Sequence, residues 1–312
     1  MVVGRVRMPV DGLLLLDKSL GWSSNQALKK AQHLLNAAKA GHCGTLDPLA
    51  SGLLPIVLGE ATKFANDILD ADKTYLADLR LGITTDTGDA EGRVLGSLPV
   101  RINASEWGDV LERFRGEIEQ TPPMYSALKH EGKPLYRYAR EGVQVKRSSR
   151  RISIFELESL AFESPRAQIR VRCSKGTYIR TLAEDIGSAL GCGAHLSGLR
   201  RERIAELDVN RAITIDDFLA LEPEQRLARV QPLDSLLQGM SALLLQPDQA
   251  RRFRLGQRIR LSEAGTCVPV FQVRVYDQNE SSAHLLGLAT LDDGLLSPIR
   301  VMNQSHKDPE TV

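Results

Sequence analysis

A glycine-rich stretch, GHCGTLDPLASG, runs from Gly41 to Gly52 and decides how the rest of the sequence is interpreted. Asp-Pro is a common helix start, with Asp as the N-cap and Pro at the first helical position, so local rules predict that Asp47 caps a helix. Three features favour a reactive carboxylate instead: glycines that let backbone approach a ligand, a nearby histidine, and a preceding helix whose lysines would attract phosphate. The stretch by itself leaves both interpretations open.

Two further residues are weaker candidates for a site with Asp47. Arg180 follows a glycine turn that leads from a strand into an amphipathic helix, a position from which an arginine can hold a carboxylate in its ionised form. Tyr75 opens a strand, and it would serve a site only if that strand end borders a cleft. By spacing alone, a surface arginine and a core tyrosine are the simpler interpretations.

The composition is that of an ordinary globular protein of 312 residues, with 42% hydrophobic and 25% charged residues. This length allows one large domain, or a large domain with a small companion. No window has the eighteen or so uninterrupted apolar residues of a membrane span. The apolar run near the start passes directly into Asp17 and Lys18 without a cleavage site, which predicts a buried strand and not a signal peptide. We therefore expect a cytoplasmic protein without a membrane partner.

The cysteines do not indicate a metal site. They are scattered, with no Cys-x-x-Cys pair, at Cys43, Cys173, Cys192 and Cys267. Cys192 and His195 have a ligand-like spacing, but the sequence supplies no further ligands nearby. We expect reduced thiols and no bound metal.

Basic residues are clustered although the net charge is only +1. Segment 129–151 holds eight basic residues against two glutamates, a second cluster comprises Arg200, Arg201 and Arg203, and a third lies within 251–260. Each cluster could be a solvated helix face. Together they favour a polyanion, such as a nucleic acid, bound on one face.

Hydrophobic periodicity predicts an α/β body followed by a small β domain. In the first part of the body we expect a strand at 12–16, a helix from Ser23 or Ser24 to about 38, a loop at 41–52 and a strand at 75–81. A polar turn at 84–92 with a return strand, a helix from Ser105 to about 118 and an irregular surface insertion at 125–150 should follow. The body should end with a strand at 168–173, a helix between the turn at Gly176 and the stop at Gly191, and a helical stretch at 215–221. From about Leu245 onward, short strands are expected at 268–276, 283–291 and 296–302.

Several long motifs, in the right order, resemble those of the TruB family of bacterial tRNA pseudouridine-55 synthases over nearly the whole chain. They are Leu16–Lys18, Gly21–Ser24, Gly41–Pro55, Lys73–Tyr75, Thr84–Asp89, Pro122–Lys129, Ser174–Leu182 and Leu196–Arg201. Two departures stand out: Ser19 replaces a usual proline, and Cys43 occupies a position that is more often Thr or Gly. Neither touches a matched catalytic position.

The resemblance implies a pseudouridine-synthase fold of the α/β (α+β) class, with a mixed, largely antiparallel central sheet flanked by helices. It implies a catalytic domain over 1–244, with an insertion at about 125–151 that clamps the RNA. A PUA-like RNA-binding β domain would occupy 245–304, and 305–312 would be a tail.

The resemblance also implies the chemistry and its residues. Asp47 would attack the ribose of a uridine in the T-loop of tRNA, at position 55, and the freed uracil would rotate and rejoin through C5. Arg180 would keep Asp47 charged, with Asp89 completing the network. Tyr75 would lie against the flipped base and could take a ribose proton. No cofactor or metal is needed, because uracil leaves as a delocalised anion.

The remaining site residues follow from the same resemblance. Tyr178 and Leu199 would line the base pocket, His42 would fill the space that the flipped uridine leaves in the RNA, and Lys18 would bind substrate. We expect the T-arm of tRNA as partner, no obligate protein partner and a monomer.

Two alternatives remain open at this stage. One is a tRNA-binding folding chaperone whose catalysis is not essential. The other is a guide-dependent synthase of ribosomal RNA, a group with basic extensions and protein partners, whereas the end of this chain, 305–312, is short and not basic. A hydrolase is disfavoured because no second carboxylate is clearly paired with Asp47.

Overall fold

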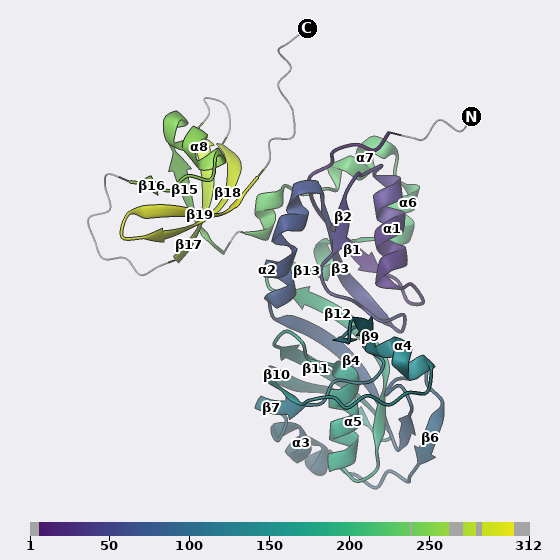
Figure 1. Ribbon diagram of the computed structural model, residues 1–312. Coiled ribbons are helices and arrows are strands. Elements are labelled where there is room, and N and C mark those ends of the chain that lie inside the picture. The colour runs from purple at the N-terminus through teal and green to yellow at the C-terminus, as the bar shows by residue number, and fades with distance from the viewer. Residues whose placement is uncertain (1–5, 238, 262–270, 279–282, 303–312) are drawn as a thin grey trace.

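The computed structural model describes residues 6–237, 239–261, 271–278 and 283–302 and contains two large sheets (Figure 1). The larger sheet runs, in spatial order, through β14 (Ile213–Thr214), β1 (Gly12–Lys18), β3 (Ala50–Leu58), β12 (Ala194–Ile204), β4 (Lys73–Leu81), β11 (Arg166–Cys173), β10 (Arg150–Glu163) and β7 (Gly116–Gln120), with β2 (Ala40–His42) on β3 and β13 (Leu207–Asp208) on β12. β1 and β14 are parallel, as are β3 and β12, and the other pairs are antiparallel. The predicted mixed, largely antiparallel sheet is confirmed.

Strand β1 is buried on both faces, which explains its uninterrupted run of leucines. Leu14 and Leu16 pack in a cluster with α1 (Ser24–Leu34) and α6 (Ile215–Ala220). Leu13 and Leu15 pack on the opposite face with η1 (Gly59–Phe64) and α2 (Ala65–Asp70). A strand covered on both faces carries no period-two alternation, so its sequence is continuously apolar.

Strand β4 is covered on one face only. Ala77, Leu79 and Leu81 are buried in the core cluster that α3 (Ala104–Glu112) and α5 (Ile179–Ala189) form with the sheet. Asp78 and Arg80 alternate with them and lie on the open face. The predicted half-buried strand is therefore confirmed, and the helix-covered face is the one on which α5 begins.

The boundaries of α1 and α5 follow from their capping residues. Ser23 accepts a hydrogen bond from the backbone of Gln26, whose side chain bonds back, so α1 begins with a capping box, and Ser23 is the cap of the two serines that the sequence offered. Helix α5 ends at Ala189 with Leu190 as its C-cap, and Gly191 follows with φ +74°, the left-handed conformation that glycine adopts without strain.

Two predicted helices end earlier than expected. The helix expected to reach 38 ends at Leu34, where the chain turns through Asn36 with φ 51°. The helix expected over 105–118 ends at Glu112, and its cap is Asn103. Residues Gly116–Gln120 form β7 instead, because they pair with β10 at the edge of the sheet. Pairing with a distant strand overrides local helix propensity here.

Strand β3 was missed because its sequence, ASGLLPIVL, has no alternation and contains Pro55. It begins inside the predicted loop 41–52. Strands β10 and β12 were also left unassigned. The elements of the expected insertion are short: β8 (Lys129–His130), β9 (Lys133–Pro134) and α4 (Leu135–Arg140). The turn after β4 returns as predicted, through β5 (Ile83–Thr85) and β6 (Val94–Ser97).

The second sheet has five strands and its own core. Its order is β15 (Ser241–Leu245), β17 (Phe271–Gln278), β18 (Ala283–Asp292), β19 (Leu295–Val301) and β16 (Ile259–Arg260), with α8 (Pro247–Arg254) packed on it. The three predicted C-terminal strands agree with β17, β18 and β19. Positions 268–270, Cys267 and the expected tail 305–312 lie outside the described residues. The chain reaches this sheet through α7 (Pro223–Ala228) and η3 (Leu233–Leu236).

The second sheet docks on η1 and α2 of the body. Lys63 Nζ donates to the carbonyl of Val301 at 3.1 Å, and Arg300 forms an ion pair with Asp67. Leu288 of β18 packs in the same buried cluster as Phe64 of η1. The contact thus combines apolar packing with one ion pair and a hydrogen bond from a lysine.

Trp107 offers a test of the core. It is 2% exposed, its ring stacks on Phe162, and its Nε1 donates to Ser159 Oγ at 2.8 Å. We expect Trp107→Ala to lower the free energy of unfolding by about 3–5 kcal/mol, because it leaves a cavity in the helix-covered core. Urea unfolding followed by circular dichroism measures this. Leu95→Ala, at a 68% exposed position, should change it by less than about 0.5 kcal/mol, and equal effects would contradict the assigned core.

Candidate active site

Asp47 lies in the loop that joins β2 to β3, and no helix follows it. The backbone N–H of Ala50 donates to the Asp47 carbonyl at 3.0 Å, which closes a tight turn over 47–50 before β3 begins. The prediction that Asp47 caps a helix is therefore wrong. The Asp-Pro pair starts a turn here because the next residues must enter the sheet beside β1.

Ser24 of α1 anchors this loop. Its buried hydroxyl accepts a hydrogen bond from the backbone N–H of Leu46 at 2.8 Å and donates to the Leu46 carbonyl at 2.9 Å. Both bonds lie one residue before Asp47. The position of the carboxylate thus depends on the start of α1.

Arg180, the second residue of α5, links Asp47 to two other segments, the turn that holds Thr87 and Asp89 and the chain at Tyr125. Its Nη2 lies 3.1 Å from Asp47 Oδ2 and its Nη1 lies 3.4 Å from Asp89 Oδ2. The same guanidinium donates to the carbonyls of Thr87 at 3.0 Å and Tyr125 at 2.7 Å. Its side chain is only 6% exposed, so these acceptors replace the water that it loses.

The surroundings of Asp47 pull its pKa in opposite directions. Burial has the largest effect and raises the pKa of this carboxyl, and the Asp89 carboxylate adds to the rise. Arg180 and Lys18 oppose it. The net pKa is raised, so Arg180 limits the shift and does not by itself produce an unusually acidic group.

Lys18 ends β1 beneath this network. Its side chain is buried, and its Nζ donates to the carbonyls of Trp22 at 2.6 Å and Ser19 at 3.1 Å. Burial lowers its pKa to about 8, against the opposing effect of Asp47. It therefore acts on Asp47 through its charge.

A cavity of about 630 Å³ opens beside Asp47. Five of the predicted site residues line it: Asp47, Tyr75, Tyr178, Arg180 and Leu199. The side chains of Lys73 and Arg201 also line it, and neither was singled out from the sequence as a site residue. This volume lies within the range of pockets that hold small ligands.

Tyr178 is fixed from two sides. Gln120, only 1% exposed, accepts a hydrogen bond from the Tyr178 backbone N–H at 2.8 Å and donates to its carbonyl at 3.1 Å. The Arg150 guanidinium lies 5.0 Å from the centre of the Tyr178 ring, a cation–π arrangement. Gln120 and Arg150 were not recognised as site residues because their partners are far away in sequence.

Tyr75 belongs to β4 and lies on the floor of the cavity. Burial raises the pKa of its phenol, and the guanidinium of Arg201 opposes the rise. A raised pKa keeps the hydroxyl protonated, so this side chain is a hydrogen-bond donor and an aromatic surface more readily than a base.

His42, Asp89 and Lys18 are predicted site residues that do not line the cavity. His42 lies in β2, and burial, with Arg201, lowers the pKa of its ring. Its Nδ1 is buried and has no hydrogen-bond partner among the described residues. Cys43, the departure noted in the sequence, is fully buried beside it in the core.

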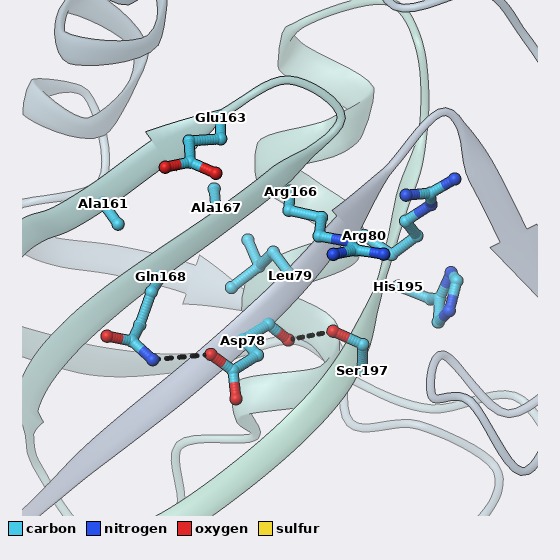
Figure 2. A pocket seen from close by; sticks show the side chains of 10 residues that line it. All are labelled: Asp78, Leu79, Arg80, Ala161, Glu163, Arg166, Ala167, Gln168, His195 and Ser197. Atoms are coloured by element: carbon cyan, nitrogen blue, oxygen red, sulfur yellow. Dashed lines mark hydrogen bonds between the residues drawn. The ribbon is translucent and has the colours of Figure 1, made fainter.

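Figure 2 shows a second cavity, of about 610 Å³, on the open face of the sheet. Arg80, Arg166 and His195 line it together with two carboxylates, Glu163 and Asp78. Gln168 donates a hydrogen bond to the Asp78 carboxylate at 2.8 Å. No carboxylate is paired there with a buried arginine among the described residues, in contrast to Asp47. This cavity is a weaker candidate for catalysis.

The second basic cluster differs from its sequence interpretation. Arg200 pairs with Asp17 at 2.6 Å, Arg203 pairs with Asp208 at 2.8 Å, and Arg201 is 1% exposed. These residues do not form a patch of free surface charge.

Within the described residues there is no group of three or more His, Cys, Asp or Glu side chains arranged to hold a metal ion. No described helix is long and apolar enough to cross a membrane.

Comparison with known proteins gives consistent matches along the chain. Residues 32–179 match the model described as "TruB family pseudouridylate synthase (N terminal domain)", 180–244 that of the "tRNA pseudouridylate synthase B C-terminal domain", and 241–302 that of "Pseudouridine synthase II TruB, C-terminal". A tRNA pseudouridine synthase B from Ralstonia nicotianae is 51% identical, over 95% of this chain and 96% of the relative. One from Azoarcus sp. is 50% identical with the same coverage.

A solved structure also resembles this chain. The crystal structure of a Cbf5-Nop10-Gar1 complex has a chain that is 26% identical, with a TM-score of 0.68, covering 93% of this chain and 84% of that one. Its agreement over most of both chains supports the same arrangement of the central sheet.

Ser24 gives a test of the loop geometry. We expect Ser24→Ala to lower the free energy of unfolding by about 1–3 kcal/mol, because both hydrogen bonds to Leu46 are lost in a buried place. Urea unfolding measures the change. The matched control is Ser105→Ala in the first turn of α3, which should stay within about 0.5 kcal/mol of the wild type. A Ser24→Ala protein as stable as this control would rule out the anchor.

Proposed function

Because the chain belongs to the TruB family of pseudouridine synthases, and is thus an isomerase that makes pseudouridine in tRNA, we propose that its target is the uridine at position 55 of the T-loop. We propose further that Asp47 reacts with this nucleoside while Arg180 and Tyr75 support it. The observation that carries the proposal is the Asp47 carboxylate, 3.1 Å from a buried arginine and lining a cavity of nucleoside size.

In the proposed reaction the C1′–N1 bond of uridine breaks and its electron pair leaves with uracil. The base turns within the cavity, a C5–C1′ bond forms, C5 loses its proton to solvent and N1 gains one. Asp47 either forms an ester at C1′ or removes a C2′ proton to give a glycal, and it is regenerated in both cases. The raised pKa of Asp47 favours it as a nucleophile or base over an ordinary carboxylate.

One carboxylate suffices because the leaving base never exits the pocket. Asp89, the nearest additional carboxylate on this network, is engaged by Arg180 and by Thr87, whose hydroxyl donates to its Oδ1 at 2.6 Å. Asp89 therefore supports the arginine and does not act as the second member of a hydrolytic pair.

The base pocket is proposed to hold a flipped uracil. Tyr75 would lie against the base, while Tyr178 and Leu199 complete the walls. His42 would occupy the space that the uridine leaves in the RNA, since a base in a folded loop must leave its stack before it can react. Lys18 supports the charge of Asp47 from below. The reaction needs no cofactor or metal.

The remaining contacts to RNA are proposed for segment 125–151 and the C-terminal sheet. The first carries eight basic residues, and Arg147 and Arg150 tie it to the body through the carbonyls of Pro122 and Gly176. The proposed domains are a catalytic domain over 1–244 and a PUA-like domain over 245–304. The PUA-like domain would bind the stem of the RNA by recognising the RNA backbone and its shape. We propose a cytoplasmic monomer with no obligate protein partner.

Two alternatives can be separated from this proposal. A folding chaperone would bind tRNA without needing Asp47. A guide-dependent synthase of ribosomal RNA would work with protein partners, and a T-arm minihelix would be a poor substrate for it. The identity of 51% to tRNA-modifying relatives, against 26% to the chain from the Cbf5-Nop10-Gar1 complex, favours the stand-alone enzyme.

Asp47→Asn tests the catalytic assignment. We expect release of tritium from C5-labelled uridine in a T-arm minihelix to fall by about 10⁴-fold or more, because the amide can neither attack nor take a proton. Binding of the same RNA, measured by filter retention, should remain within about twofold. Asp216→Asn, at an exposed position of α6, is the matched control and should match the wild type. Activity near the wild-type rate in Asp47→Asn would overturn Asp47 as the reacting group, whereas a wild-type chain that binds the RNA but releases no tritium would favour the chaperone.

The pH dependence of the single-turnover rate tests the state of Asp47. Activity requires the ionised carboxylate, and burial raises its pKa, so the acid limb should lie at higher pH than for an ordinary aspartate. Lys18→Met removes an opposing positive charge and should move this limb to still higher pH. Arg229→Met, an exposed control, should leave it in place. A limb that moves down, or does not move, in Lys18→Met would contradict the electrostatic assignment.

A further inference from the structure

Arg201 is a buried arginine that the proposed reaction has not yet used. It lies on β12, opposite Tyr75 of β4 on one side and Gly52 of β3 on the other. A β-bulge between Arg201 and Arg203 follows it, and bulges near sites re-aim side chains. Arg201 is 1% exposed, and it lines the cavity beside Asp47.

The guanidinium of Arg201 holds the loop that carries Asp47. Its Nη2 donates to the carbonyl of Gly44 at 3.0 Å, and its Nε donates to the carbonyl of Leu53 at 2.8 Å. Gly44 has φ +90°, and a Cβ there would lie 3.2 Å from Arg201 Nη1. The glycine thus leaves room for the arginine beneath the loop.

The charge of Arg201 has no carboxylate beside it. Within the described residues no acidic side chain lies within ion-pair distance of Arg201, whereas Arg200 and Arg203 each have one. A guanidinium carries a permanent positive charge. Its effect reaches the cavity, since it opposes the rise that burial causes in the pKa of the Tyr75 phenol and adds to the fall that burial causes in the pKa of the His42 ring.

A buried charge without a counter-ion is costly, and replacing it with an apolar side chain of similar size is often neutral or stabilising. The stability of the folded protein therefore does not by itself explain why position 201 carries a charged side chain. Two carbonyl hydrogen bonds could be made by a neutral donor. The unpaired charge calls for an anion that forms in the adjacent cavity.

We propose that Arg201 positions the Gly44 loop and Tyr75, and that its charge behind the base pocket stabilises uracil as the anion that leaves the ribose. This inference rests on the proposed function. The departing electron pair spreads over the uracil ring, and a fixed positive charge in a dry site stabilises such developing charge without touching it. Arg201 is thus a positioning residue whose electrostatic effect is felt in the bond-breaking step.

The test compares leaving groups. T-arm minihelices carry either uridine or 5-fluorouridine at the target position, and fluorine makes the base a more stable anion that depends less on outside stabilisation. Single-turnover loss of the target nucleoside is followed after digestion of the RNA. The variants are Arg201→Met, which removes the charge, Arg201→Lys, which keeps the charge but loses the planar fork, and the paired surface control Arg203→Gln.

We expect Arg201→Met to slow the reaction of uridine by about 100-fold and that of 5-fluorouridine by clearly less, with RNA affinity within about twofold. Arg201→Lys should slow both substrates to a similar extent, because only positioning is impaired. Arg203→Gln should match the wild type. If Arg201→Met does not fold, as judged by thermal unfolding, Arg201→Gln supplies the neutral variant.

Equal losses on the two substrates in the neutral variant would overturn the electrostatic role. Unchanged rates would overturn both roles, and a loss confined to RNA affinity would make Arg201 an RNA contact. Failure of the proposed function gives a different result, since the wild-type chain would then not convert the uridine substrate.

Discussion

The ion pair between Asp47 and Arg180 is the interaction on which the rest of the site depends. A guanidinium this deeply buried must satisfy its donors within the protein, and it does so with two carboxylates and two carbonyls. These acceptors come from the loop before β3, the turn after β5 and the start of segment 125–151. Removing one partner of a buried pair commonly costs about 3–5 kcal/mol, so each of these segments is held to the start of α5. The position of the Asp47 carboxylate and local stability therefore share one set of contacts.

The central sheet determines where this pair can form. Strands β3, β12 and β4 are neighbours, and the side chains of β4 alternate between the helix-covered face and the open face. Tyr75, Leu199 and Arg201 lie on the covered face and line the cavity. On the open face, two arginines of β11 are paired with acids, Arg170 with Glu202 and Arg172 with Glu156. These two ion pairs therefore lie on the face opposite the cavity that Asp47 lines.

Secondary-structure elements with a local sequence pattern could be predicted from the sequence. β4, α5 and the C-terminal strands have clear periods and end signals, and the long motifs implied the family and the cavity-lining residues. Prediction from the sequence failed for segments whose conformation depends on pairing with a strand that is distant in the chain. Asp47-Pro48 has the features of a helix start, but pairing of β3 with β1 makes it a turn. Residues 116–120 join β10, which helix propensity cannot reveal. Gln120 and Arg201 gained their importance only through burial and strand register.

The burial of Cys43 has a consequence for redox chemistry. The Cys43 thiol lies between His42 and Gly44 in the chain, yet it is closed to solvent, and burial raises its pKa to about 12. Cys173, also fully buried, has its pKa raised to about 12 in the same way. Oxidants and alkylating agents attack the exposed thiolate, so both sulfurs are poor targets. The loop that carries Asp47 therefore contains a cysteine whose thiol is shielded from peroxide and electrophiles.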